Sequence, residues 1–298
     1  MHYAILGNTH LRVSRIGFGC MSIKADEANG IPLIQQALDN GINYFDTADL
    51  YEQGANESLL GKALTGRRHQ AIIATKVGNQ WRPDGSSWDW NPTKAYIISA
   101  VEQSLRRLRT DHIDLYQLHG GTIEDPVDET IEAFELLKSQ GKILHYGISS
   151  IRPNVIRTWT ERSAIASVMM QYSLLDRRPE ETALQLLQSK GIGVVVRGSV
   201  AQGLLAGKGP KPYLDHPEAA VARAAQAIKD ITGDDKDGAQ TAIGFTLHHP
   251  AVTAAIVGIR TPEQLQQALK AGDAPPLTNE QWTALSEAAP ALDYREHR

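Results

Sequence analysis

The chain has 298 residues, of which 42% are hydrophobic and 21% charged, so it can bury a sizeable core and is neither a disordered nor a fibrous sequence. Its 34 acidic and 30 basic residues give a formal net charge of −4, which argues against a general nucleic-acid or membrane-surface role. The single cysteine, Cys20, rules out a disulfide framework within the chain and a cysteine-rich metal site, and the lack of a long apolar stretch predicts a cytoplasmic protein.

The first residues and eight short apolar runs outline the predicted strands. Residues 1–14 predict a β-hairpin that turns at Gly7-Asn8. The eight runs that follow are in part continuously apolar, which is typical of strands covered on both faces. The second and sixth are short enough to be helix fragments instead. The predicted strands end near residues 19, 46, 76, 119, 149, 171, 197 and 258.

Amphipathic helical patterns lie between these runs. Ile97, Val101 and Leu105, for example, fall on one helical stripe. Three helices are predicted to stop at a glycine directly before a strand, at Gly41, Gly141 and Gly191, so helix-to-strand turns repeat along the chain.

Two steps between strands are longer than one βα unit and predict insertions. The first holds three tryptophans with prolines and a glycine, and we expect a long loop there. The second spans 198–250 and contains helical stretches at 219–231 and 239–247. Residues 279–289 predict a terminal helix.

Eight βα units in one uninterrupted chain favour an α/β fold, a (β/α)8 TIM barrel with an N-terminal β-hairpin and extra C-terminal helices. A doubly wound open sheet is the alternative. We therefore predict a single domain over residues 1–298, with the hairpin at 1–14, the barrel at 15–272 and a C-terminal helix and tail at 273–298.

Polar residues end the apolar strands, at the rim where barrels of this type carry their chemistry. The second strand ends in Asp46, with Tyr51 in the next loop, the third in Lys76 and the fourth in His119. Each residue has a simpler explanation when it is taken alone. Asp46 could cap the following helix, and Tyr51 could be a packed aromatic. Lys76 could be a solvated strand end, and His119 could be a hydrogen-bonded residue inside the barrel. Their occurrence on three neighbouring strands favours a site.

The chemistry of this set can be stated from the residue types. An ammonium beside a tyrosine stabilises its phenolate, so Lys76 is expected to lower the pKa of Tyr51, and Asp46 would hold Lys76 charged. A neutral His119 could hydrogen-bond a carbonyl oxygen. The set can protonate an alkoxide, but it has no nucleophilic serine or cysteine, no metal cluster and no electron source, so a hydride must come from a cofactor.

The sequence strongly resembles the aldo-keto reductase superfamily over most of its length, with the motifs in the family's order and spacing. The matching segments are Arg15 to Gly19, Asn43 to Ala48 with Tyr51, Lys76, Asp114 to His119, Gly147 to Ser149, Gln202 to Lys208, and Gly258 to Leu265. The resemblance implies a barrel enzyme that reduces carbonyl compounds with NADPH. It implies Tyr51 as proton donor, Lys76 and Asp46 as the pair that tunes it, and His119 as the residue that orients the substrate.

The resemblance also implies which residues hold the cofactor. Ser149 and Gln171 match residues on the nicotinamide carboxamide, a loop after the seventh strand matches the pyrophosphate segment, and the Arg260 region matches the segment around the 2′-phosphate. The full set of implied cofactor residues is Gly19, Asp46, Ser149, Ser150, Gln171, Arg197, Gly198, Ser199, Gln202, Gly203, Leu204, Gly258, Arg260, Thr261 and Gln264.

Four positions depart from the family's pattern. Ser150 stands where many members have Asn or Arg, and Arg197 replaces an aromatic that stacks on the nicotinamide. Arg197 could stack in its own way or bind an anionic substrate group. Gln264 and Gln267-Ala268 weaken the expected preference for NADP over NAD, so NAD stays possible.

Three functions remain open. The first is the carbonyl reductase, with a small-molecule substrate contacting Tyr51, His119, Trp81 and Trp88; the tryptophan loop could equally pack over the barrel. The second is a cofactor-sensing regulatory subunit with little turnover. The third is an aldolase that forms a Schiff base on Lys76, which its pairing with Asp46 disfavours. The sequence predicts no nucleic-acid or membrane partner and no metal, and it leaves the oligomeric state open, with a monomer possible.

Overall fold

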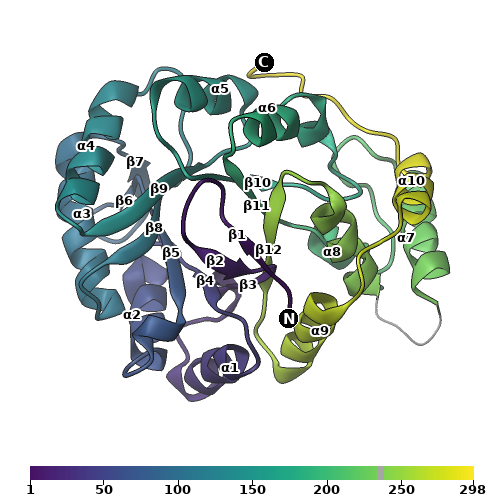
Figure 1. Ribbon diagram of the computed structural model, residues 1–298, viewed down its shortest axis with the longest axis horizontal. Helices are drawn as coiled ribbons and strands as arrows, with labels where there is room; N and C mark the ends of the chain where they lie inside the picture. The colour runs from purple at the N-terminus through teal and green to yellow at the C-terminus, as the bar shows by residue number, and fades with distance from the viewer. Residues whose placement is uncertain (234–237) are drawn as a thin grey trace.

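The computed structural model describes residues 1–233 and 238–298. Eight parallel strands close into a barrel, in the order β10-β11-β12-β3-β4-β5-β8-β9, with β9 pairing to β10 across the seam. Figure 1 looks along this barrel, with the helices arranged around it. The strands are β3 (Ile16–Gly19), β4 (Tyr44–Asp46), β5 (Ile72–Val77), β8 (Ile113–Leu118), β9 (Ile143–Ser149), β10 (Ser167–Gln171), β11 (Gly193–Arg197) and β12 (Val252–Gly258).

The predicted (β/α)8 barrel is confirmed, and the open sheet is excluded because the eighth pairing closes the sheet. The two short runs that could have been helix fragments are strands β4 and β10.

The helices are α1 (Glu27–Asp39), α2 (Ala55–Ala63), α3 (Lys94–Leu108), α4 (Val127–Ser139), α5 (Pro153–Arg162), α6 (Ala183–Ser189), α7 (Glu218–Thr232), α8 (Gly238–His248), α9 (Pro262–Asp273) and α10 (Asn279–Ala288). Short 3-10 turns are η1 (Cys20–Ser22), η2 (Tyr51–Gly54), η3 (Arg68–Gln70), η4 (Arg178–Glu181) and η5 (Ala201–Gly203).

Alternation along each strand sorts the apolar side chains into two cores. In β11, Val195 belongs to a cluster inside the barrel, whereas Val194 and Val196 pack with the surrounding helices. In β5, Ala74 faces inward and Ile73 outward in the same way. Successive side chains of a strand point to opposite faces. The residue two positions after an inward-facing apolar residue therefore also points into the barrel.

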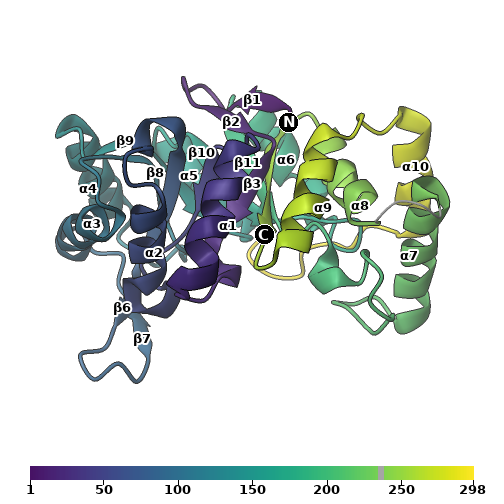
Figure 2. The same ribbon diagram turned by 90° about the horizontal axis from the view of Figure 1, so that it is seen from below.

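The N-terminal hairpin closes one end of the barrel. It consists of β1 (Tyr3–Ile5) and β2 (Arg12–Ser14), and its residues Leu6, Leu11 and Val13 belong to the interior cluster. Gly7 adopts a φ of +52°, and a Cβ there would lie within 2.7 Å of the Gly193 backbone nitrogen, so the turn needs glycine. Figure 2 shows this hairpin at the top, against the strand ends.

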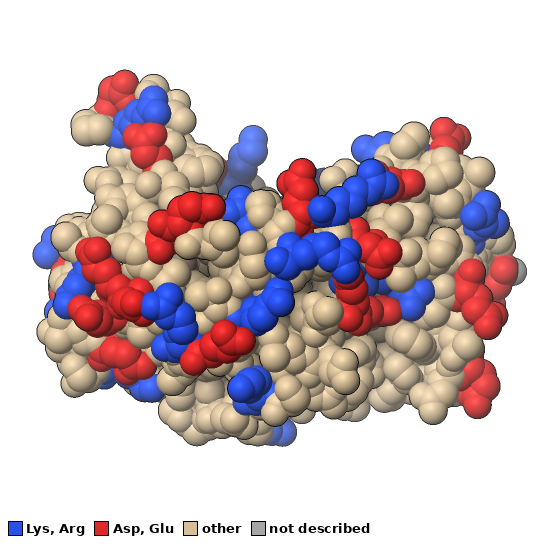
Figure 3. Space-filling model, turned by 90° about the horizontal axis from the view of Figure 1, so that it is seen from above, with Lys and Arg blue, Asp and Glu red and all other residues tan. Residues whose placement is uncertain are grey.

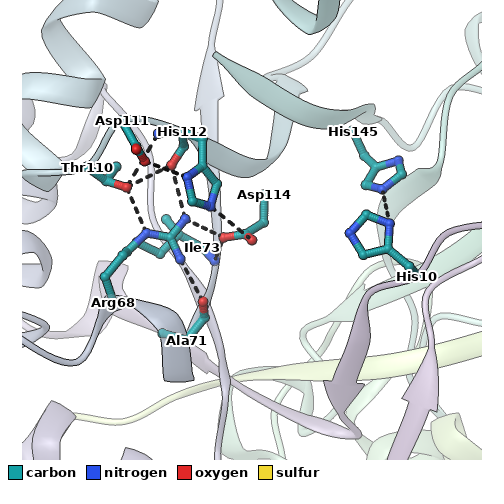
Figure 4. A network of polar contacts seen from close by, with 9 residues as sticks. All are labelled: His10, Arg68, Ala71, Ile73, Thr110, Asp111, His112, Asp114 and His145. Atoms are coloured by element: carbon teal, nitrogen blue, oxygen red, sulfur yellow. Dashed lines mark hydrogen bonds and ion pairs between the residues drawn. The ribbon is translucent and has the colours of Figure 1, made fainter. Parts of the chain in front are cut away.

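Polar contacts also tie together the strand beginnings at this closed end (Figure 4). Arg68 donates to Asp114 Oδ2 at 2.6 Å and to the carbonyls of Ala71 and His112, while the Ile73 amide donates to the same carboxylate oxygen. Nearby, His145 of β9 lies 3.4 Å from a histidine in the hairpin turn, His10. We assign this network to stability, since it joins β5 to β8 at the end opposite the predicted site.

The first insertion differs from the predicted loop. It forms an antiparallel hairpin of β6 (Asn79–Trp81) and β7 (Trp88–Trp90), in which Trp81 faces Trp88 across the strands. Aromatic pairs favour such strands, and the tight turn at Gly85, with a φ of +71°, joins them. Figure 2 shows this hairpin projecting from the end opposite β1 and β2.

The later elements follow the sequence pattern closely. The stretches predicted as helical at 219–231 and 239–247 are α7 and α8, and the predicted terminal helix is α10. After α10 the tail runs back to α5, where the amide of Asn154 donates to the His297 carbonyl at 2.8 Å. Among the helices in residues 1–233 and 238–298, none has the length and apolar character needed to cross a membrane.

Candidate active site

The candidate residues come together because they continue the inward faces of their strands. Tyr44 and Ala74 belong to the barrel's interior cluster, so Asp46 and Lys76, two positions later, point inward at the open end. The same spacing takes β10 and β11 from interior apolar residues to Gln171 and Arg197, which are register partners. One layer of polar side chains therefore caps the apolar interior.

Lys76 is the centre of the candidate catalytic group. It is 1% exposed, and its ammonium donates to Asp46 Oδ2 at 2.6 Å and to the Thr47 carbonyl at 2.8 Å. The third contact joins Lys76 Nζ to the Tyr51 hydroxyl at 3.5 Å. The predicted trio therefore forms one connected chain that runs from the buried Asp46 and Lys76 to the half-buried Tyr51 hydroxyl.

Tyr51 stands on a short, unusual turn. It begins η2, and the two residues that follow, Glu52 and Gln53, both have positive φ, which side chains seldom adopt outside tight turns. Trp81 of the β6–β7 hairpin donates from its indole nitrogen to the Leu50 carbonyl at 3.1 Å. The hairpin therefore supports the segment that carries Tyr51.

Burial decides the direction of the pKa shift for two members of the trio. It raises the pKa of Asp46 and of Tyr51, and the nearby Lys76 ammonium only partly offsets either rise. For Lys76 itself, burial alone would lower the pKa, but Asp46 and Tyr51 outweigh burial and the pKa is raised. Lys76 acts on the pKa of Tyr51 in the expected downward direction, but burial raises that pKa by more, so Tyr51 is a neutral phenol at neutral pH.

His119 faces Tyr51 across the same opening. Its ring meets the tyrosine ring edge-on, with the centroids 5.7 Å apart. Burial, Lys76 and Arg197 together lower the pKa of His119 to about 3. The imidazole is therefore neutral at physiological pH, as predicted, and can act as a hydrogen-bonding group but not as a cation.

A second polar group lies at the ends of β9, β10 and β11. The Gln171 side chain accepts from Arg197 Nη1 at 3.2 Å, and Arg197 is exposed at the rim. Ser149 is half-buried at the end of β9, whereas Ser150 is buried and its hydroxyl accepts from the Arg152 amide at 3.2 Å. Ser149, Gln171 and Arg197 are therefore the members of this group that remain open to a ligand.

The loop after β11 is a tight turn. Gln202 and Gly203 have φ values of 60° and 92°. The amides of Gly203 and Leu204 donate to the carbonyls of Val200 and Ala201 at 2.8 Å and 3.1 Å, so these two amides serve the turn itself. Ser199 is buried with its hydroxyl 3.2 Å from that of Thr246, and Leu204 is 1% exposed. Gly198, also at positive φ, starts the loop beside Gln171.

A cavity of about 620 Å³ lies between α1, the segment from η1 to α1, and the start of α9. Lys24, Arg260 and Thr261 contribute positive charge and a hydroxyl to it, which fits a phosphate, while Asp26 and Glu263 at its edge do not. Gln264 uses its side chain to accept from the Arg260 amide at 3.0 Å, so it shapes the start of α9. Two further glycines from the implied cofactor set, Gly19 and Gly258, border this region. A Cβ on Gly258 would collide with Ser22, and a Cβ on Gly19 would touch β12.

Two tryptophans were predicted near the substrate, and they differ in position. Trp81 is partly buried against the Tyr51 segment, whereas Trp88 is 45% exposed on the projecting hairpin. In the space-filling view the projection at the upper left is this hairpin, and the surface beside it is hollowed (Figure 3). Cys20 is 1% exposed and burial raises the pKa of its thiol, which matches the reading of a small core residue.

Sequence reasoning missed two groups that contact the trio. Gln117 is fully buried, pairs in register with Lys76 and helps to lower the pKa of Asp46. The Thr47 carbonyl is the second acceptor of the Lys76 ammonium. Strand alternation could have found Gln117, because it lies two residues after Leu115 on the inward face. A backbone carbonyl such as that of Thr47 leaves no signal in the sequence.

The described residues contain no cluster of three or more side chains suited to a metal ion. Comparisons with known proteins give concordant matches. The family model of the "Aldo/keto reductase family" matches residues 15–290. An oxidoreductase of Bacillus subtilis named YqkF and described as uncharacterized is 46% identical, over 98% of both chains. A fission yeast protein, "Aldo-keto reductase yakc [NADP(+)]" of Schizosaccharomyces pombe, is 33% identical over 69% of this chain and 63% of its own.

The solved structure of aldo-keto reductase AKR11C1 from Bacillus halodurans is similar along the whole chain. Its holo form superposes with a TM-score of 0.95 at 48% identity, covering 100% of this chain and 99% of the other. Its apo form, at the same coverage, superposes with a TM-score of 0.87. The present fold is therefore closer to the holo form.

Proposed function

The chain belongs to the aldo/keto reductase family, a family of oxidoreductases, and from that membership we propose that it reduces aldehydes or ketones to alcohols with NADP(H). The observation that carries the proposal is the connected chain of Asp46, Lys76 and Tyr51, which ends at a protonated hydroxyl beside a neutral His119. This arrangement suits delivery of a proton to an oxygen that is gaining negative charge.

When bound, the nicotinamide cofactor supplies the hydride. Tyr51 then donates its hydroxyl proton to the carbonyl oxygen, which becomes the alcohol. The phenolate that remains is stabilised by the Lys76 ammonium, 3.5 Å away in the structure. Asp46 keeps this ammonium charged and in place, because its carboxylate accepts from Nζ at 2.6 Å.

His119 orients the substrate in this scheme. A neutral imidazole can donate one N–H to the carbonyl oxygen and so hold that oxygen near the Tyr51 hydroxyl. Since the pKa of His119 is about 3, the imidazole adds no positive charge to the site at neutral pH. Trp81 and Trp88 are proposed to border the substrate on the side of the β6–β7 hairpin.

The proposed cofactor is NADPH. Its nicotinamide carboxamide would meet Ser149, Gln171 and Arg197, its pyrophosphate the backbone of the loop after β11, and its 2′-phosphate the cavity that Lys24, Arg260 and Thr261 line. The NADP(+) in the name of the yeast relative supports this choice. The neutral Gln264 leaves some affinity for NADH.

The Schiff-base alternative loses support from the geometry. A lysine attacks a carbonyl only as the free amine, and the raised pKa of Lys76 together with its contact to Asp46 keeps it protonated. The cofactor-sensing alternative predicts tight NADPH binding with almost no turnover, so a rate measurement separates it from the reductase.

The test is a binding titration of NADPH and NADH, followed by turnover on a panel of aliphatic, aromatic and sugar-derived aldehydes. We expect tighter binding of NADPH and steady oxidation of it by at least one carbonyl compound. Failure to bind either dinucleotide contradicts the proposal, and tight binding without turnover across the panel supports the sensing role.

A further inference from the structure

A buried carboxylate lies behind Gln171, outside the residues assigned so far. Asp176 is 0% exposed, and its Oδ2 accepts from Gln171 Nε2 at 2.7 Å. The other hydrogen of the same amide nitrogen points to the Tyr213 hydroxyl at 3.3 Å. On its opposite side, Gln171 Oε1 accepts from Arg197 at 3.2 Å.

These neighbours determine which way the Gln171 amide points. A carboxylate can only accept hydrogen bonds and a guanidinium can only donate them. Asp176 therefore requires the amide nitrogen on its side, and Arg197 requires the amide oxygen on the other. The two constraints agree, so the rim presents an acceptor, Gln171 Oε1, next to a donor, Arg197.

An acceptor beside a donor is the complement of a primary carboxamide, which offers an N–H and a carbonyl oxygen side by side. We propose that Asp176 is a positioning residue that fixes Gln171 so that its oxygen and Arg197 together read the carboxamide of the nicotinamide. This inference rests on the proposed function, because it assumes that a nicotinamide dinucleotide binds.

Asp176 is itself held from a third direction. Arg178 donates to both carboxylate oxygens, from Nε at 2.7 Å and from Nη2 at 2.8 Å. Its guanidinium in turn lies over the ring of Tyr294 in the C-terminal tail, 5.0 Å from the centroid. A bidentate pair of this kind fixes the plane of the carboxylate. The tail thus completes the support of Gln171.

The experiment compares three ligands by calorimetric titration: NADP+, its 3-acetylpyridine analogue, which lacks the carboxamide N–H, and 2′-phospho-ADP-ribose, which lacks the ring. The wild-type protein should prefer NADP+ over the analogue by about five- to tenfold, the worth of one hydrogen bond to a buried acceptor. In Asp176→Asn one of the two oxygens that accept from Arg178 and Gln171 becomes an amide nitrogen, which cannot accept. The Gln171 amide is then held less firmly, and the ratio of the affinities for NADP+ and the analogue should fall toward one. Affinity for 2′-phospho-ADP-ribose should not change.

Asp215→Asn is the matched control, because Asp215 lies in the neighbouring loop and pairs with Arg295 at the surface, 3.1 Å away. It should keep the wild-type preference. Tyr213→Phe removes the second acceptor of the amide nitrogen without changing a charge and should lower the preference less than Asp176→Asn; it serves alone if the latter does not fold.

The outcomes are separable. An unchanged preference in Asp176→Asn, or in Tyr213→Phe if that is the folded variant, overturns the inference and leaves the proposed function intact. Equal loss of affinity for all three ligands also overturns it, since that result indicates a merely structural role. Failure of the wild-type protein to bind NADP+ contradicts the proposed function instead.

Discussion

At the scale of single residues, burial decides the charge state of the site. The Lys76 ammonium lies inside the barrel and donates hydrogen bonds to Asp46 and to the Thr47 carbonyl. Its charge lowers the pKa of Tyr51 by less than burial raises it. The sequence predicted which residues would meet, because their spacing along the strands is visible. It could not predict the net direction for Tyr51, because burial depends on loops and helices that are remote in sequence.

One buried acid near the site, Asp49, makes the stability of the folded protein depend on pH. Asp49 is 7% exposed, and burial followed by the neighbouring Glu57 raises its pKa to about 8, against a weaker opposite effect of Arg107. The Leu50 amide and the Tyr96 hydroxyl, 3.5 Å from Oδ2, both donate to this carboxyl and offset part of the rise. Unfolded, this carboxyl would ionise near pH 4. Folding therefore opposes its ionisation, and the protein loses stability as the pH rises from about 4 to about 8.

Asp49→Asn should remove this loss, because an amide of the same shape does not ionise. We expect its free energy of unfolding to exceed that of the wild type by on the order of 3 kcal/mol at pH 8 and the difference to vanish near pH 4. Urea unfolding at pH 4.5, 6 and 8 measures this. Asp230→Asn, on the exposed face of α7, is the control. A difference that does not grow with pH would contradict the assignment.

At the scale of elements, the strands were predictable and the first insertion was not. Apolar runs that end in polar residues mark β4, β5 and β8, since burial on both faces requires such runs. The β6–β7 hairpin has three tryptophans but only three residues in each strand. Strands this short give no alternating pattern in the sequence by which they could be recognised. Its position beside the Tyr51 segment depends on a tertiary contact, from Trp81 to the Leu50 carbonyl.

That contact can be tested with a matched pair of variants. Trp81→Phe keeps an aromatic ring but removes the hydrogen bond to the Tyr51 segment, worth about 1 kcal/mol, so turnover should fall by about fivefold. Trp88→Phe changes the facing tryptophan, which is 45% exposed; it keeps an aromatic ring beside the substrate and leaves the Trp81 hydrogen bond intact, so it should lower turnover less than Trp81→Phe does. Steady-state rates with NADPH and a carbonyl substrate provide the measurement. Equal rates in both variants would show that the hairpin does not support the segment.

At the scale of the whole molecule, the two ends of the barrel have different tasks. One end is closed by the β1–β2 hairpin and joined by the Arg68 network, while the other ends in the inward polar layer. Repeated βα units predicted this barrel, and the polar strand ends predicted that the Lys76 group and His119 would lie together at one end of it. The support of Gln171 by Asp176 and Tyr294 was not predictable, because it brings together residues 171, 176 and 294 through the path of the tail.

The central claim is that Tyr51 gives the proton in a carbonyl reduction that depends on NADPH. The most direct test is Tyr51→Phe, with NADPH binding and single-turnover reduction measured on the same protein. We predict unchanged NADPH affinity and a rate lowered by about 10²- to 10⁴-fold, the usual contribution of a positioned general acid. Reduction at the wild-type rate, with NADPH still bound, would contradict the assignment of Tyr51.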